Sequence, residues 1–165
     1  MWNVTITSPL ADHPFVTRLS RVMNLSEANL CFVKDGYAIR YRLLRSGKRQ
    51  ILNVVLPGDV VGFPMSFFAR ANYAVVALTD LTYSVCPLES FAQLCYEQPA
   101  FGLALSWIAA HEAANYAEHV VDLGRRTPPE RLAHFLLELH ARLRVVGHAE
   151  ESRFHLPFSQ EIIAD

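Results

Sequence analysis

Hydrophobic and polar residues follow a short-strand pattern from about residue 31 to residue 87. The stretch CFVKDGYAIRYRLLRSGKRQILNVVLPGD contains apolar-rich runs of about four to eight residues, separated by turn signals at Asp35-Gly36, Ser46-Gly47 and Pro57-Gly58. Two further runs, YAVVALTD and LTYSVCP, follow and end at Pro87. Many short antiparallel strands at this spacing predict a β-sandwich or a β-roll. Residues 14–29, before this region, are expected to form short helical pieces.

One of these strands has a clear two-face pattern. Arg40 and Arg42 lie on one face, and Ile39, Tyr41 and Leu43 lie on the other. Because successive side chains of a strand point to opposite faces, this alternation predicts a sheet with one face exposed to water.

The pattern becomes helical at Leu88. LESFAQLCYEQ predicts a short helix that ends before Pro99, and AFGLALSWIAAHEAANYAEHVVDLG predicts a helix of about 24 residues, roughly 36 Å long. Gly124 is expected to end this helix as a C′ glycine. We therefore expect a β domain followed by one long helix.

The long helix carries a stripe that is apolar in its first half and polar in its second. Alanines beside the stripe would allow another helix to approach closely, and a second copy of the chain is the economical partner. The sequence therefore predicts a homodimer whose interface contains Phe101, Leu105, Ile108, Glu112 and Asn115.

A third helix is predicted within RRTPPERLAHFLLELHARLRVVG. Thr127 suits the N-cap, Pro128 the first helical position and Glu130 the third, which together form a capping box, and Gly147 suits the end of the helix. The segment RFHLPF predicts a short strand, and SQEIIAD predicts the start of another helix at Ser159.

Composition and charge narrow the class of protein. The chain has 165 residues, of which 52% are hydrophobic and 19% charged, as is typical of a folded domain. The net charge of −1 provides no overall basic field for nucleic acid. The three cysteines form no paired motif and are expected to be reduced thiols. No signal peptide is visible, and the longest apolar run, FGLALSWIAA, is about half of a membrane span. We expect a cytoplasmic protein with no membrane partner.

Three segments together resemble the Crp/Fnr family of bacterial transcription regulators: LPGDVVGF at 56–63, LGRRTPPERLAHFLLEL at 123–139 and FHLPFSQEIIAD at 154–165. The resemblance implies an α+β protein. Its parts would be an antiparallel β-roll (double-stranded jelly roll) sensor domain of the cyclic nucleotide-binding type at 1–98, a dimerisation helix at 99–123, and the beginning of a winged helix-turn-helix domain at 124–165.

The same resemblance implies a DNA-binding transcription regulator. Its expected partners are a second copy of the chain, operator DNA in the full-length protein, RNA polymerase and a small-molecule effector. The recognition helix would follow SQEIIAD and is absent from the 165 residues, so Ser159 and Gln160 are expected to touch a phosphate at most. We expect this chain to bind operator DNA weakly or not at all. The alternative is a stand-alone ligand-sensing or protein-interaction module without DNA binding.

The effector pocket departs from the cyclic-nucleotide pattern of the family. That pattern has Gly-Glu-Leu and, about ten residues later, Arg-Ser. Here Gly62 matches, but Phe63 replaces the glutamate and Asn72 falls in the Arg-Ser position, while Arg70 lies just before that position. Burying a phosphate without its arginine is costly, so the expected effector is a small molecule other than cAMP. The expected pocket residues are Gly62, Phe63, Met65, Arg70, Asn72, Tyr73 and Tyr116. Alternatively, the aromatic residues simply fill the roll.

No catalytic or metal-binding motif is present. The sequence lacks GxSxG, HExxH, a P-loop and GxGxxG, so we do not expect an enzyme. Residues 1–30 hold no cysteine that could ligate an iron–sulfur cluster, and residues 31–87 hold no histidine for a cupin-like metal site. His111 and His119 on the long helix more simply belong to its polar half. We expect neither a cofactor nor a metal.

Overall fold

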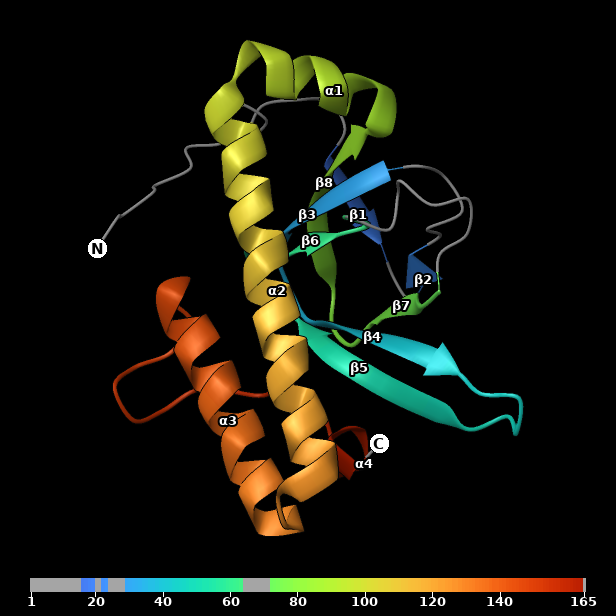
Figure 1. The fold of residues 1–165 in the computed structure, drawn as a ribbon, viewed down its shortest axis with the longest axis vertical. Coiled ribbons are helices and arrows are strands. Elements are labelled where there is room, and N and C mark those ends of the chain that lie inside the picture. Colours follow the sequence, from blue (N-terminus) through green and yellow to red (C-terminus); the bar gives the residue numbers. More distant parts are fainter. Residues whose placement is uncertain (1–15, 20–21, 24–28, 64–71, 165) are drawn as a thin grey trace.

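The chain folds into a β unit, one long helix across it, and a shorter helix beside the long one (Figure 1). The structure is a computed structural model that describes residues 16–19, 22–23, 29–63 and 72–164. The expected α+β architecture with an antiparallel roll is confirmed.

The roll consists of two four-stranded sheets whose paired strands all run antiparallel. The first sheet has the order β1-β8-β3-β6 and the second β2-β7-β4-β5. Their bounds are β1 Val16–Leu19, β2 Val22–Met23, β3 Asn29–Asp35, β4 Ala38–Leu43, β5 Arg49–Val55, β6 Val60–Val61, β7 Ala74–Ala77 and β8 Leu81–Pro87. The expectation of helical pieces at 14–29 is wrong at 16–19 and 22–23, where β1 and β2 pair with β8 and β7; residues 14–15, 20–21 and 24–28 lie outside the described residues.

Four helices complete the described chain: α1 Leu88–Glu97, α2 Pro99–Arg125, α3 Pro128–Val145 and α4 Gln160–Ala164. The helix predicted to end at Gly124 continues to Arg125, and Gly124 keeps a helical backbone. The capping box of α3 is confirmed, since Glu130 accepts hydrogen bonds of 2.7 Å from both the backbone N–H and the hydroxyl of Thr127. The stop of α3 is confirmed as well, because Gly147 has a φ of +76° and the N–H of His148 returns to the carbonyl of Leu143.

The predicted turns have the backbone geometry that requires glycine. Gly36 has a φ of +89°, and a Cβ placed there would lie 2.0 Å from the backbone oxygen of Asp80. Gly58, in the turn between β5 and β6, has a φ of +91°. These positions explain why the short runs form strands of the expected length.

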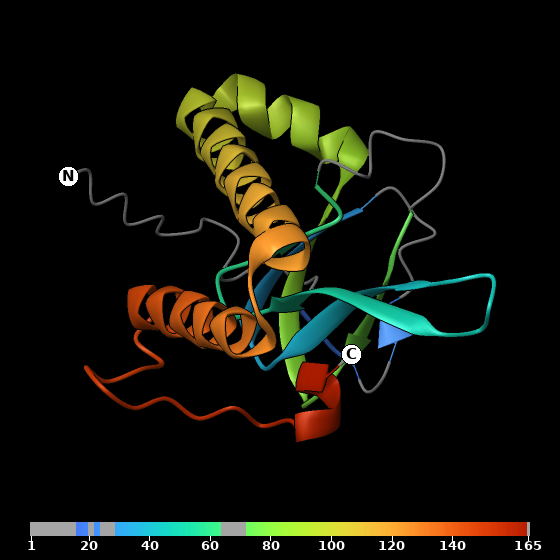
Figure 2. The ribbon, with the colours of Figure 1, turned by 60° about the horizontal axis from the view of Figure 1, so that its bottom comes forward.

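The second sheet is buried on both faces at β4 and β5. Inside the roll, Ala38 and Val55 belong to a cluster shared with β3, β7 and β8. On the outer side, Ile39 and Val54 pack against Leu139 and Leu143 of α3, together with Phe158 and Ile162 near the C-terminal end. Figure 2 shows the segment after α3 turning back and running below α3 to reach α4.

This double coverage corrects the prediction of a half-exposed strand. Ala38, Ile39 and Arg40 are all buried, and only the far end of β4, including Arg42, is exposed. A register shift between Arg40 and Tyr41 interrupts the regular pairing of β4 with β5. Arg40 therefore lies inside the protein and not on its surface.

The first half of α2 packs against the roll of its own chain. Phe101, Leu105 and Ile108 join Leu30, Val60 and Cys86 in one apolar cluster, and Leu105 is only 2% exposed. The apolar part of the predicted stripe on α2 therefore packs against the roll of its own chain, with Leu105 buried and Phe101 and Ile108 partly buried.

Candidate functional site

Arg40 lies at the centre of the contact between the roll and α2. Its side chain is 2% exposed, and its Nη2 donates a 2.6 Å hydrogen bond to the carbonyl of Val60. The guanidinium carbon lies 5.4 Å from the centre of the Tyr73 ring, within the range of a cation–π contact. The Val60 carbonyl of β6 and the Tyr73 ring therefore hold the cation.

The opposite charge comes from α2. Nη1 of Arg40 donates a 2.7 Å hydrogen bond to Oε1 of Glu112. Burial by itself would lower the pKa of Arg40, but the carboxylate of Glu112, with smaller contributions from Tyr73 and Tyr116, raises the pKa overall. Arg40 is therefore a charged group inside the protein, neutralised by a side chain from another element.

Gly62 and Tyr73 lie beside this ion pair. The N–H of Gly62 donates a 3.3 Å hydrogen bond to the hydroxyl of Tyr73. Gly62 has a φ of +97°, and a Cβ there would lie 2.3 Å from the backbone oxygen of Asn29, so only glycine fits. Burial raises the pKa of Tyr73, so its hydroxyl stays neutral at pH 7.

The structure brings together only part of the predicted effector pocket. Gly62, Tyr73 and Tyr116 gather around Arg40. Phe63 instead lies 6.1 Å, centre to centre, from the ring of Phe91 on α1. Asn72 is exposed at the start of the segment that leads to β7. The predicted pocket residues Met65 and Arg70 lie outside the described residues.

Sequence reasoning missed the central pair. Arg40 was assigned to an exposed strand face and Glu112 to a dimer interface, and the two residues are 72 positions apart. The sequence shows Ala38 and Ile39 as adjacent apolar residues, a weak sign of a strand buried on both faces. It shows nothing that joins Arg40 to Glu112.

A groove of about 170 Å³ opens next to the pair, between α2, α3 and the turn before β6. Its lining includes Glu112, Asn115 and Tyr116 from α2, Asn53 from β5, and Val146 after α3. The side-chain oxygen of Asn53 is buried and has no hydrogen-bond partner among the described residues. Glu112 therefore reaches Arg40 with its carboxylate while forming part of the wall of an open groove.

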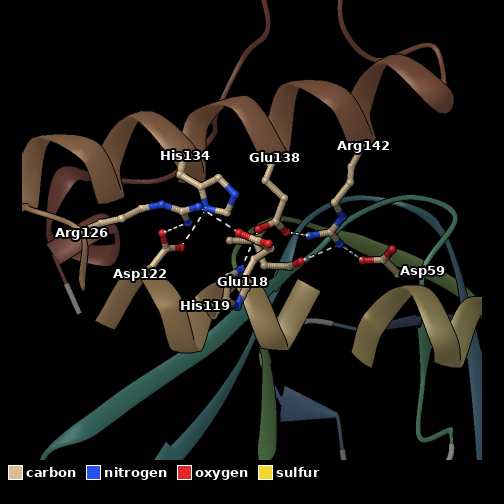
Figure 3. A network of polar contacts seen from close by, with 9 residues as sticks. Asp59, Glu118, His119, Asp122, Arg126, His134, Glu138 and Arg142 are labelled. Carbon is tan, nitrogen blue, oxygen red and sulfur yellow. Dashed lines mark hydrogen bonds and ion pairs between the residues drawn. The ribbon is translucent and has the colours of Figure 1, made fainter. Parts of the chain in front are cut away.

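A second polar centre joins α2 to α3 (Figure 3). Nε2 of His119 lies 2.7 Å from Oε2 of Glu138, and Arg142 donates to Oε1 of Glu138 at 3.1 Å. Arg142 also donates to Oδ2 of Asp59 at 2.5 Å and to the carbonyl of Val54 at 3.0 Å. This α2–α3 network thus reaches the turn that follows β5.

Near the C-terminal end of α2, the same network surrounds the buried carboxylate of Asp122. Asp122 pairs with Arg126 and, at 2.8 Å, with Nδ1 of His134, while Arg126 also donates to Glu118 at 2.9 Å. Burial raises the pKa of Asp122, but the hydrogen bonds from Arg126 and His134 outweigh it and lower the pKa.

Burial and hydrogen bonding also oppose each other at Glu138 and His119. Burial raises the pKa of Glu138, but the hydrogen bond from His119 and the charge of Arg142 lower it overall. In turn, the hydrogen bond with Glu138 raises the pKa of His119. Protonated His119 therefore strengthens the contact between the two helices.

The remaining predicted residues lie apart from both centres. Ser159 and Gln160 are exposed where α4 begins, and the N–H of Ile162 donates to the carbonyl of Ser159. Within the described ranges, no group of three or more histidine, cysteine or acidic side chains could hold a metal ion. None of the helices in the described part of the chain combines the length and apolar content needed to cross a bilayer.

Comparison with known proteins gives a consistent family. Residues 25–98 match the model of the cyclic nucleotide-binding domain. The nitrogen fixation regulation protein FixK of Bradyrhizobium diazoefficiens is 33% identical over 133 residues, which cover 81% of this chain and 55% of that protein. The transcriptional activator protein Anr of Pseudomonas protegens is 30% identical over 135 residues, which cover 81% and 54%.

A solved structure agrees with these relatives. FixK2 from Bradyrhizobium japonicum superposes with a TM-score of 0.76 at 27% identity, over 90% of this chain and 74% of that chain. The chain belongs to the Crp/Fnr family of transcription regulators. It spans about half the length of the curated relatives that it matches.

Proposed function

We propose that this chain is the sensor and dimerisation part of a DNA-binding transcription regulator, and that two copies pair along an exposed face of α2. The family supports the first statement. The exposed face of α2 supports the second and carries the proposal, because it gives the helix a surface that its own chain leaves uncovered.

That face has the spacing of a coiled-coil seam. Its residues recur at alternating intervals of four and three positions and are all exposed in the single chain: Leu103, Trp107, Ala110, Ala114, Ala117, Val121 and Gly124. A repeat of 3.5 residues keeps one stripe facing a partner helix. The small residues in its middle would let two helices approach closely. We call these seven residues the α2 seam.

The α2 seam replaces the interface expected from the sequence. Leu105, Glu112 and His119, seven residues apart, lie on the opposite side of α2 and contact the roll or α3. One side of α2 therefore packs against its own chain, and the other side is exposed and could contact a second copy. In such a dimer the exposed Trp107, 67% exposed here, would be covered.

Sedimentation of the purified chain tests this pairing. We expect a dimer, and Ala114→Glu should raise its dissociation constant at least tenfold, about 1.4 kcal/mol, because two like charges would meet at the seam. Ala141→Glu, at an exposed position of α3, is the matched control and should leave the dimer intact. A wild-type monomer at high concentration would contradict the proposal.

DNA binding requires a separate test on the protein expressed from its intact gene. Incubated with fragmented genomic DNA, it should enrich two-fold symmetric sites whose half-sites lie about one helical turn apart, roughly 34 Å. RNA polymerase would be a further partner at such sites, and the protein would act in the cytoplasm. Dimerisation without any enrichment of DNA would favour the alternative, a stand-alone sensing or interaction module.

The proposed regulator responds to an effector other than cAMP. Phe63 occupies the position of the acidic residue in the cyclic-nucleotide pattern and packs towards α1, and Glu112 already neutralises the buried Arg40. Calorimetry with cAMP should therefore show no micromolar binding. We retain the proposed division into a sensor domain at 1–98, a dimerisation helix at 99–123 and the beginning of a DNA-binding domain at 124–165.

A further inference from the structure

The roll contacts the guanidinium of Arg40 through Val60 and Tyr73. The carbonyl of Val60 fixes Nη2 at 2.6 Å, and the Tyr73 ring lies under the guanidinium carbon at 5.4 Å. At 2% exposure, Arg40 has almost no access to water. In the packed chain, Arg40 is therefore a desolvated cation that needs an anion.

The anion is supplied by another element and only partly satisfies the cation. Glu112 reaches in from α2 with a side chain that is 21% exposed, ten times more than that of Arg40. One carboxylate oxygen contacts Nη1, and Nε of Arg40 is buried with no partner among the described residues. Arginine and carboxylate groups frequently pair through two parallel hydrogen bonds, so this slot is not completely filled.

We propose that Glu112 is a built-in ligand: its carboxylate occupies an anion-binding slot formed by Arg40, and this slot accepts a small monocarboxylate when Glu112 is removed. The inference rests on the proposed sensor role of the roll and deepens it. Under this scheme the roll holds α2 through an internal anion, in the place where a soluble effector would otherwise join the two.

The chemistry of the slot favours a carboxylate. Its one cation balances one negative charge, and the carbonyl oxygen of Val60 beside it would repel further anionic oxygens. A phosphate with about two charges would remain half neutralised in a buried place. The groove lined by Glu112 and Tyr116 provides a way in for a small ion from solvent.

Chemical rescue tests the slot. Glu112→Ala should lower the melting temperature of the chain by on the order of 10 °C, because Arg40 would remain buried and unpaired. Sodium formate at tens of millimolar should restore several degrees in a saturable way, as expected for a ligand that binds the folded state alone. Sodium chloride at equal ionic strength should not.

Two variants separate a specific slot from a general salt effect. In Arg40→Met/Glu112→Ala the cation is gone, and formate should have no effect beyond that of chloride. Glu118→Ala is the matched control on the same helix, because Glu118 pairs with the more exposed Arg126; formate should not change its melting temperature. Equal responses of Glu112→Ala to formate and chloride would overturn the proposal.

A different substitution at Glu112 covers the case in which Glu112→Ala does not fold. Glu112→Gln keeps the shape of the side chain but removes its charge, and titration calorimetry should then detect formate binding that the wild-type chain lacks. No detectable binding to a folded Glu112→Gln would overturn the proposal. Because neither assay involves DNA or the α2 seam, these outcomes are independent of those that test the regulator itself.

Discussion

The two polar centres of α2 differ in their exposure to water. The Arg40–Glu112 pair places a cation that is 2% exposed against the roll, with one carboxylate for it. The α2–α3 network spreads its charges over side chains that are 12% to 54% exposed, with two histidines among them. We call Arg40–Glu112 the dry pair because its cation is almost fully buried. Removing one partner of a buried ion pair costs much stability, whereas removing one contact from a partly hydrated network costs little.

This difference assigns separate tasks to the two centres. The Arg40–Glu112 pair joins the roll to α2. The α2–α3 network joins α2 to α3 and to the turn at Asp59, and it contains His119, whose charge changes near neutral pH. The contact between α2 and α3 should therefore respond to pH through His119.

Breaking the dry pair should have the largest effect. Glu112→Leu should cost about 3 kcal/mol in the free energy of unfolding, measured by urea denaturation, because a buried arginine loses its counter-charge. Arg40→Met/Glu112→Leu should recover most of that loss. If the single and the double variant were equally destabilised, the cost would come from packing and not from charge.

Arg142 should have the next largest effect, since it joins α3 to two parts of the roll. Arg142→Leu removes the contacts with Asp59 and the Val54 carbonyl and should cost about 1–2 kcal/mol in urea denaturation, less than the dry pair because Arg142 is 16% exposed. Arg144→Leu, at an exposed position of the same helix, should be nearly neutral. Equal losses would argue against a specific contact with the roll.

The α2–α3 network should also depend on pH. The pKa of His119 is raised from 6.5, so its stabilising contribution is complete below about that pH and is lost as the pH rises through the folded pKa. The pKa of Glu138 is lowered from 4.5, so its contribution is complete above that pH and is lost on acidification. Asp122 and Arg142 also face His119 and act on it in opposite directions.

The stability that His119 provides should therefore be largest between about pH 4.5 and 6.5. The free energies of unfolding of the wild type and of His119→Gln should differ most in this pH range. As the pH rises above the folded pKa of His119, their difference should fall below about 1 kcal/mol, because the histidine is 24% exposed. Urea denaturation at several pH values checks this. His148→Gln, at an exposed position, is the control, and a constant difference across this range would contradict the assigned role.

Arg126 should have the smallest effect. It pairs with Asp122 and Glu118 at the open end of the network. Arg126→Gln should change the urea midpoint only slightly, and the change should disappear in molar salt, where exposed charges are screened. A large change in the urea midpoint that persists in high salt would mean that the contacts of Arg126 are shielded from solvent.

Much of the fold could be predicted because its signals are local. The turn glycines, the change of period at Leu88, the capping box at Thr127 and the stop at Gly147 each depend on a few neighbouring residues. The errors have a different cause. β1 and β2 were expected to be helical, yet they are strands because β8 and β7 lie beside them.

The candidate site was less predictable. Gly62, Tyr73 and Tyr116 were predicted to line the effector pocket and lie around Arg40, whereas Phe63 lies near Phe91. The stripe on α2 was found, but the pattern of one helix does not reveal which of its faces its own chain covers. Only the packed structure shows that Leu105 faces the roll while Leu103 remains exposed.

The sequence by itself determined most elements from β3 onward, their order and the resemblance to a family of regulators, because turns, caps and periodicity act over a few residues. The tertiary structure alone decided that Arg40 is buried, that Glu112 neutralises it, and which side of α2 remains exposed. These features depend on groups that are far apart in the chain, and a buried charge acquires its partner only when the strands and the helix pack together.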